Sequence, residues 1–135
     1  MKIIVAGDGN VGNAVTGRLA KEGSDQTVID SKQSVLQEIQ ERDDVMVVEG
    51  NAASMPVLRA AGVEDADLLI AATSADEINL LCCLTARSMN PDLHTIARVR
   101  NPDYAEQEFA MRRQLGLSMA VNPEMDAARE ICRLL

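Results

Sequence analysis

Lys2-Ile-Ile-Val-Ala6 runs without a break into Gly7-Asp8-Gly9-Asn10-Val11-Gly12 near the start of the chain. After Lys2 the first segment is apolar and rich in β-branched residues, which predicts a buried strand, and residues 13–22 predict a helix. A strand, a G-x-G-x-x-G turn and a helix in this order are typical of a dinucleotide-binding βαβ unit. The chain therefore predicts a phosphate-binding turn close to its amino terminus.

Each glycine of this turn has a separate task in that geometry. Gly7 permits the tight turn, Gly9 lets the backbone approach a pyrophosphate, and Gly12 lets the helix pack closely against the strand. The helix is expected to begin near Asn10, so that its unpaired N–H groups and positive dipole end face the phosphates. The candidate cofactor-binding residues of the turn are Gly7, Asp8, Gly9, Asn10, Val11 and Gly12.

A second apolar segment, Gln26-Thr-Val-Ile-Asp30, ends on a carboxylate. An acid near the end of the second strand is where this fold binds the ribose hydroxyls. Such a carboxylate accepts hydrogen bonds from the 2′- and 3′-hydroxyls and repels a 2′-phosphate, so Asp30 favours NAD, ATP or ADP over NADP. Ser31 and Lys32 follow directly and join the candidate site, and the Lys32 cation keeps open a ligand with a phosphate at that position.

Short apolar segments alternate with helical ones along the whole chain. This alternation predicts an α/β fold of Rossmann-like type: a doubly wound, six-stranded parallel sheet with helices on both faces and the strand order 3-2-1-4-5-6. With 135 residues and 47% hydrophobic side chains, residues 1–135 are expected to form one domain. The expected strands span residues 2–6, 26–30, 45–48, 66–72, 95–100 and 117–121, and the expected helices residues 13–22, 31–42, 54–61, 74–89, 102–115 and 123–135.

Two serines are expected to cap helices. Ser54 precedes a short helix, and Ser74-Ala-Asp-Glu77 has the S-x-x-E form of a capping box. The helix after Ser74 is expected to face the core with the residues that recur at helical spacing, namely Ile78, Leu81, Cys82, Thr85, Ala86 and Met89.

Ligands of doubly wound sheets bind at the carboxyl ends of the strands, where the strand order reverses. Beside the glycine turn and Asp30, this edge is expected to gather Asn51, Ala52, Ala72, Thr73, Ser74 and Asn79. The hydroxyl and amide groups among these residues can hydrogen-bond ribose or adenine, or can cap the following helix, and the two roles are compatible.

Two arginines complete the candidate site. Arg98 and Arg100 alternate along the fifth predicted strand, so both are expected to point to the same face. An arginine at the end of that strand can reach a β- or γ-phosphate. The alternative is an ion pair with Asp76 or Glu77.

Charge and composition exclude several classes of function. The net charge of −8 argues against a nucleic-acid partner and against an anionic membrane surface. The three cysteines form no C-x-x-C motif, and no acid–base pair, activated nucleophile or metal cluster is evident, so we expect no catalytic residues, no metal site and no enzyme activity. The alternatives are a cofactor-binding fragment of an NAD-dependent oxidoreductase and, with less support, a methyltransferase. No apolar run approaches membrane-spanning length, and we expect a cytoplasmic chain.

Several motifs together resemble the RCK (KTN) domain, the regulator of potassium conductance, and most closely the nucleotide-binding subunit of bacterial Trk potassium uptake. The resemblance covers essentially the whole chain, although Gly50-Asn51 stands where the family often has Gly-Asp. The motifs are the first twelve residues, Val28-Ile-Asp30, Gly50-Asn-Ala52, Ala72-Thr-Ser-Ala-Asp-Glu-Ile-Asn79, Ala97-Arg-Val-Arg-Asn-Pro102 and Val121-Asn-Pro-Glu124.

The resemblance implies a regulatory domain that binds NAD(H) or ATP/ADP and forms a homodimer or a larger ring. Such a domain assembles beneath a membrane potassium transporter or channel subunit, at the inner face of the cell membrane, and couples nucleotide binding to gating. The resemblance also supports Arg98 and Arg100 as phosphate-binding residues.

The last predicted helix, residues 123–135, carries two apolar stripes and ends on Leu134-Leu135 without a polar stop. One stripe covers a sheet face, and the second is expected to pack on a partner subunit, in a chain that we expect to continue further. Ile131→Asp should therefore give monomers in light scattering, because it buries an unpaired carboxylate at the interface. A parent protein that stays monomeric at high concentration would contradict the prediction. The stripes are Met125, Ala128, Cys132 and Leu135, and Ala127, Ile131 and Leu134.

Overall fold

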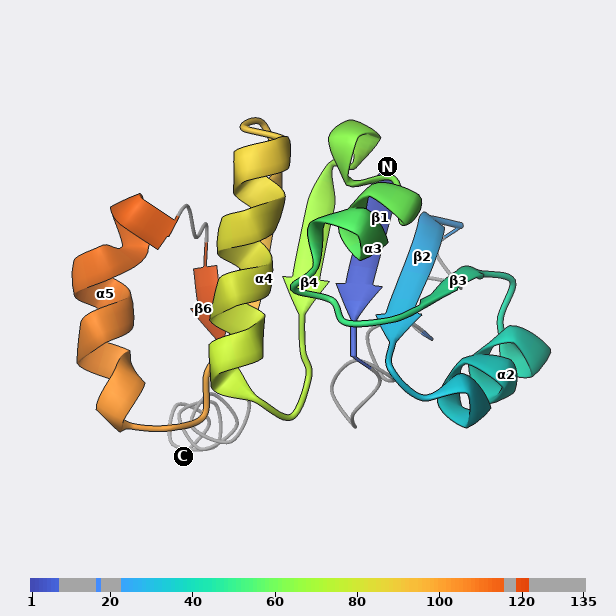
Figure 1. Ribbon diagram of the computed structural model, residues 1–135, viewed down its shortest axis with the longest axis horizontal. Helices are drawn as coiled ribbons and strands as arrows, with labels where there is room; N and C mark the ends of the chain where they lie inside the picture. The colour runs from blue at the N-terminus through green and yellow to red at the C-terminus, as the bar shows by residue number, and fades with distance from the viewer. Residues whose placement is uncertain (8–16, 18–22, 116–118, 122–135) are drawn as a thin grey trace, which may run out of the picture.

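A single parallel sheet forms the centre of the domain (Figure 1). The computed structural model describes residues 1–7, 17, 23–115 and 119–121. The strand order β3-β2-β1-β4-β5-β6 confirms the predicted doubly wound topology, in which the order reverses between β1 and β4. The strands are β1 (Lys2–Ala6), β2 (Asp25–Asp30), β3 (Met46–Glu49), β4 (Leu68–Ala71), β5 (His94–Arg98) and β6 (Met119–Val121).

Described helices pack on both faces of this sheet. Alternation along β1 divides the core, because Ile3 and Val5 face one side while Ile4 and Ala6 face the other. The first side is covered by α2, and the second by α3 and α4. The helices are α2 (Gln33–Arg42), α3 (Met55–Ala60), α4 (Asp76–Met89) and α5 (Asp103–Leu115), with a 3₁₀ turn, η1 (Val63–Asp65), before β4.

The start of α4 differs from the predicted capping box. Ala75, not Ser74, occupies the N-cap position and makes no side-chain capping hydrogen bond. The Asp76 carboxylate instead accepts hydrogen bonds from the backbone N–H groups of Arg100, at 3.0 Å, and Asn101, at 2.7 Å. An acid in the first turn of α4 therefore accepts the backbone N–H groups of the two residues Arg100 and Asn101, which follow β5. The strand β5 ends at Arg98 rather than at Arg100.

The starts of α2 and α3 can also be compared with the prediction. Lys32 is the N-cap of α2, which begins two residues later than predicted, because the Asp30 carboxylate accepts a hydrogen bond from the Lys32 backbone N–H. Ser54 is at the N-cap of α3 as predicted, but its side chain makes no capping hydrogen bond.

The buried face of α4 is also rotated from the predicted one. Leu81 was expected in the core but is 49% exposed, and Asn79 is fully buried instead. Hydrophobic spacing alone favours Leu81, whereas the hydrogen bonds of Asn79, described below, turn that residue inward. Cys82 and Ala86 are buried as predicted.

Several expected features lie outside the described residues: Asp8, Gly9, Asn10, Val11 and Gly12 of the glycine turn, the helix expected at 13–22 except for residue 17, and the terminal helix at 123–135.

None of the helices in the described part of the chain combines the length and the apolar character needed to cross a bilayer.

Candidate functional site

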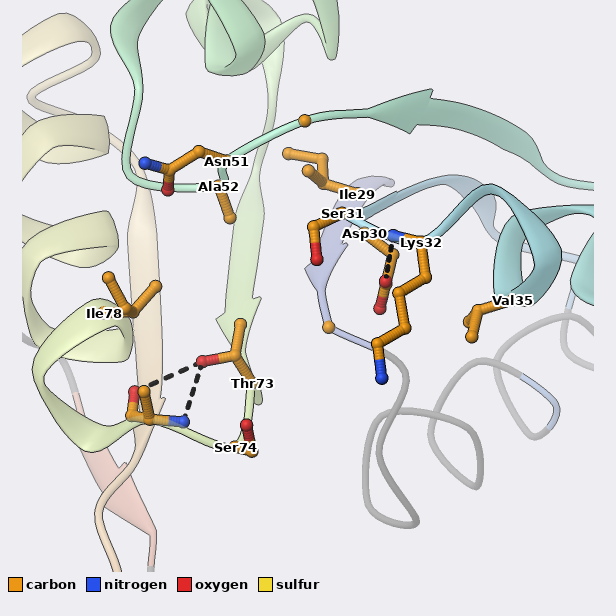
Figure 2. Close-up of a pocket in the computed structure, with 13 residues that line it drawn as sticks. Ile29, Asp30, Ser31, Lys32, Val35, Asn51, Ala52, Thr73, Ser74 and Ile78 are labelled. Carbon is orange, nitrogen blue, oxygen red and sulfur yellow. Dashed lines mark hydrogen bonds between the residues drawn. The ribbon is translucent and has the colours of Figure 1, made fainter.

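A pocket of about 480 Å³ opens at the carboxyl edge of the sheet, among the segments that follow β1, β2, β3 and β4 (Figure 2). This is the edge where a doubly wound sheet binds its ligand. Its described lining residues are Gly7, Ile29, Asp30, Ser31, Lys32, Val35, Gly50, Asn51, Ala52, Thr73, Ser74, Ala75 and Ile78.

Most of the predicted site residues within the described ranges line this pocket. They are Gly7, Asp30, Ser31, Lys32, Asn51, Ala52, Thr73 and Ser74. Ala72 and Asn79 were expected at the rim but are fully buried behind it. Neither Arg98 nor Arg100 lines the pocket.

Gly7 makes the turn that leaves β1. Its backbone has a φ of 89°, a left-handed conformation that glycine adopts without steric cost, and its N–H donates to the Ile29 carbonyl at 2.8 Å. A Cβ at this position would lie 2.7 Å from both the Cα and the backbone N of Thr73. The turns after β1 and β4 are therefore in direct contact, and only glycine fits between them.

Asp30 ends β2 with its carboxylate beside the pocket. Its Oδ1 accepts a hydrogen bond from the Lys32 N–H at 2.8 Å, and its backbone carbonyl accepts one from Gly50 at 2.9 Å. The Lys32 side chain lines the same pocket (Figure 2). This arrangement presents a fixed carboxylate to ligand hydroxyls and an ammonium to a nearby phosphate.

Asn51 shapes the loop after β3. Its Oδ1 accepts the Ala53 N–H at 2.9 Å, and its carbonyl accepts the Ser54 N–H at 3.0 Å. This local turn leads into α3 and puts Ala52, which is 6% exposed, at the base of the loop. Asn51 lies at the rim of the pocket (Figure 2), in agreement with its predicted place.

Thr73 forms the wall of the pocket after β4. Its hydroxyl donates to Asn79 Oδ1 at 2.6 Å and accepts the Ala75 N–H at 3.3 Å. Figure 2 shows the hydroxyl turned toward the start of α4 and the side-chain methyl turned up into the pocket. Thr73 therefore offers the ligand an apolar surface, while Ser74 is the exposed hydroxyl of this turn.

A second hollow of about 450 Å³ adjoins the first through Ser74 and Ala75. Its lining continues from the start of α4 to the chain after β5 and includes Arg100. Because β5 ends at Arg98, the two arginines do not alternate on one strand as predicted: Arg98 is partly buried, with its Nη1 3.5 Å from the Thr73 carbonyl, and Arg100 is exposed.

Arg100→Ala is expected to weaken ATP binding by about three- to tenfold and to leave AMP binding unchanged. The reason is its position, since a chain of phosphates that leaves the first pocket past Ser74 enters the hollow that Arg100 lines. Titration calorimetry with AMP, ADP and ATP measures the difference. Equal losses for all three nucleotides would remove Arg100 from the phosphate path.

Sequence reasoning missed five residues of the pocket. Ile29, Val35, Ala75 and Ile78 supply apolar lining, and Gly50 lets α3 approach, because a Cβ there would lie 2.6 Å from Val57 Cγ2. Each lies within a few residues of a predicted polar group. The sequence signal that could have identified these residues is their position close to the ends of β2, β3 and β4.

Burial disfavours the thiolate form of the two described cysteines, Cys82 and Cys83. Burial raises the pKa of Cys82 to about 12 and raises the pKa of Cys83 as well. Neither lines the pocket, and both sit in the core beneath α4. They are packing groups rather than nucleophiles.

Comparison with known proteins identifies the family of this chain. The family model of the TrkA-N domain matches residues 3–123. The Trk system potassium uptake protein TrkA of Haemophilus influenzae is 36% identical over the whole chain, and the TrkA homolog of Archaeoglobus fulgidus is 38% identical over the whole chain. The chain spans about 30% of the length of these two relatives.

Solved structures show the same fold. The TrkA-N domain of the inner membrane protein ybaL from Escherichia coli superimposes with a TM-score of 0.87 at 28% identity, over 99% of this chain and 96% of that one. The Kef CTD of Shewanella denitrificans in AMP-bound form gives a TM-score of 0.81 at 28% identity, over 97% and 77%. The fold, the family model and the relatives agree, and the chain belongs to the TrkA-N domain family.

Proposed function

We propose that this domain binds an adenine nucleotide, NAD(H) or ATP/ADP, in the pocket after β1, β2, β3 and β4. The observation that carries the proposal is the convergence of the Gly7 turn and the Asp30 carboxylate on one pocket of about 480 Å³. This size lies within the usual range for small-molecule sites. The residues that line the pocket fit an adenine nucleotide: Asp30 offers a carboxylate to the ribose hydroxyls, Gly7 makes a tight turn, and Lys32 supplies a cation.

The pocket accounts for each part of such a ligand. The ribose hydroxyls would be held by Asp30, and adenine would lie against the apolar side chains of Val35, Ala52 and Ile78. The phosphates would run toward the Gly7 turn, with Lys32 as a nearby counter-charge in a protein of net charge −8. The remainder of a dinucleotide would extend into the hollow beside Arg100, across the point where the strand order reverses.

A related solved structure supports an adenine nucleotide as the ligand. The Kef CTD structure, 28% identical, holds AMP. Structures of the GsuK channel, 24% identical over 89% of this chain, are described as bound to NAD and to ADP, and this likeness concerns the fold alone. The proposed ligand class is therefore an adenine nucleotide. Calorimetric titration with each nucleotide distinguishes NAD(H) from ATP/ADP.

We further propose that the domain is a cytoplasmic regulator of potassium uptake. The relatives are named as Trk system potassium uptake proteins, and this domain is about 30% of their length. In this role the domain assembles as a homodimer or ring beneath a membrane transporter or channel subunit, and nucleotide binding changes gating. Potassium flux through the reconstituted transporter should then respond to nucleotide with the parent domain and fail to respond with Asp30→Ala.

Binding without turnover distinguishes this role from an oxidoreductase fragment. We expect saturable binding of NADH with no change in its absorbance when hydroxy or keto acids are added. Turnover of NADH with any such acid would favour the enzyme. Binding of ATP and ADP at the same site without turnover would favour the regulator.

A further inference from the structure

We propose that Asn79 is a positioning residue for the nucleotide pocket, although none of its atoms lines that pocket. The inference rests on the proposed function and extends it to a buried residue on α4. Asn79 is 0% exposed, and its side chain lies behind the turn that follows β4. A buried amide in an otherwise apolar core is costly unless it is fully hydrogen-bonded, so its contacts show what it holds in place.

The Asn79 amide makes four hydrogen bonds, and three of them go to Thr73. Its Oδ1 accepts from the Thr73 N–H at 2.8 Å and from the Thr73 hydroxyl at 2.6 Å. Its Nδ2 donates to the Thr73 carbonyl at 3.1 Å and to the Arg98 carbonyl at 2.9 Å. The side chain therefore fixes the backbone of Thr73 at both its polar groups and ties it to the end of β5.

Thr73 in turn supports the turn after β1. A Cβ on Gly7 would lie 2.7 Å from the Thr73 backbone, so the glycine turn rests on this residue without space for a methyl group. A displacement of Thr73 would move the base of the phosphate-binding turn and the Ser74–Ala75 segment that the two hollows share. Affinity for the nucleotide thus depends on Asn79 through Thr73.

These four hydrogen bonds require a side chain at position 79 that carries both a donor and an acceptor. Leucine or alanine at position 79 would remove the acceptor of the Thr73 N–H and one donor to each of the Thr73 and Arg98 carbonyls. Aspartate would set an acceptor against those carbonyls. Among ordinary side chains of this length, only asparagine supplies both groups. An apolar residue would have served if packing against the core were the sole requirement.

A second asparagine on the same helix provides a matched control. Asn90, the C-cap of α4, is 9% exposed, and its Nδ2 donates to the Val63 and Ala66 carbonyls at 3.0 Å each. Its Oδ1 accepts the Asp92 N–H at 3.1 Å. It performs the same kind of structural task at the end of the helix remote from the pocket, where it lines neither hollow.

The test compares Asn79→Ala with Asn90→Ala in thermal unfolding and in calorimetric titration with ADP and NAD. Both variants should lower Tm, but only Asn79→Ala should weaken nucleotide binding, by about tenfold or more in the folded protein. If Asn79→Ala does not fold, Asn79→Ser and Asn90→Ser, which keep a polar group, replace the pair.

Two results would overturn this inference while leaving the proposed function intact. One is a folded Asn79 variant that binds ADP and NAD as tightly as the parent. The other is an equal loss of affinity in the Asn90 variant, since that would reflect general loosening of α4. A parent protein that binds neither nucleotide would overturn the proposed function as well.

Discussion

Gly7→Ala is expected to lower the free energy of unfolding by about 3–5 kcal/mol and to remove the nucleotide pocket in any protein that folds. Two costs add at this position. The backbone φ of 89° costs an L-residue about 1–2 kcal/mol, and the new Cβ would lie 2.7 Å from the Thr73 backbone. Because the obstacle is main chain rather than a flexible side chain, relief requires β1 and β4 to shift relative to each other. Urea unfolding followed by circular dichroism measures the loss.

Gly23→Ala is the matched control for this experiment. Gly23 also has a left-handed φ, 78°, but a Cβ there would meet nothing within 4 Å. This variant should therefore show only the backbone cost, about 1 kcal/mol. Equal stabilities of the two variants would contradict the close contact between the turns after β1 and β4.

Asp30→Ala is expected to weaken binding of every adenine nucleotide by about 1–3 kcal/mol, roughly 5- to 150-fold, because charged hydrogen bonds to the ribose are lost. The carboxylate also accepts the Lys32 N–H at the start of α2, so the alanine variant removes a capping interaction too. Asp30→Asn separates the two effects, since it keeps the acceptor for Lys32 and removes the charge. Asp30→Arg should admit NADP by removing the repulsion of its 2′-phosphate.

The control for Asp30 is Glu49→Ala. Glu49 is the exposed acid paired with Asp30 across β2 and β3, and it does not line the pocket. Its removal changes the net charge equally and should leave affinity unchanged. If Asp30→Ala binds every nucleotide as tightly as the parent, the ribose does not lie at Asp30.

The positions of the strands and the turn at Gly7 could be predicted because each depends on local sequence. β-branched runs define the strands, and Gly7 and Asp30 stand at the ends of two of them. Since parallel strands end at the same edge, the ends of β1, β2, β3 and β4 had to meet. Asp30, Asn51 and Ser74 were accordingly predicted at the edge where the pocket forms.

The role of Asn79 could not be predicted, because its contacts depend on how the turn after β4 and the end of β5 pack against α4 in the folded domain. Hydrophobic spacing placed Leu81 in the core, whereas hydrogen bonds to Thr73 and Arg98 turn Asn79 inward. The capping box at Ser74 failed for a related reason. Asp76 in the first turn of α4 accepts hydrogen bonds from two backbone N–H groups after β5. The spacing of residues within α4 cannot predict a contact with a different strand.

The central claim is that the carboxyl-edge pocket is an adenine-nucleotide site, and calorimetric titration of the purified domain with NAD, NADH, ATP and ADP in turn tests it most directly. The proposed site predicts saturable binding of at least one of these nucleotides at one site per chain, weakened by Asp30→Ala and unaffected by Glu49→Ala. Absence of saturable binding for all four, or binding that Asp30→Ala leaves unchanged, would contradict it.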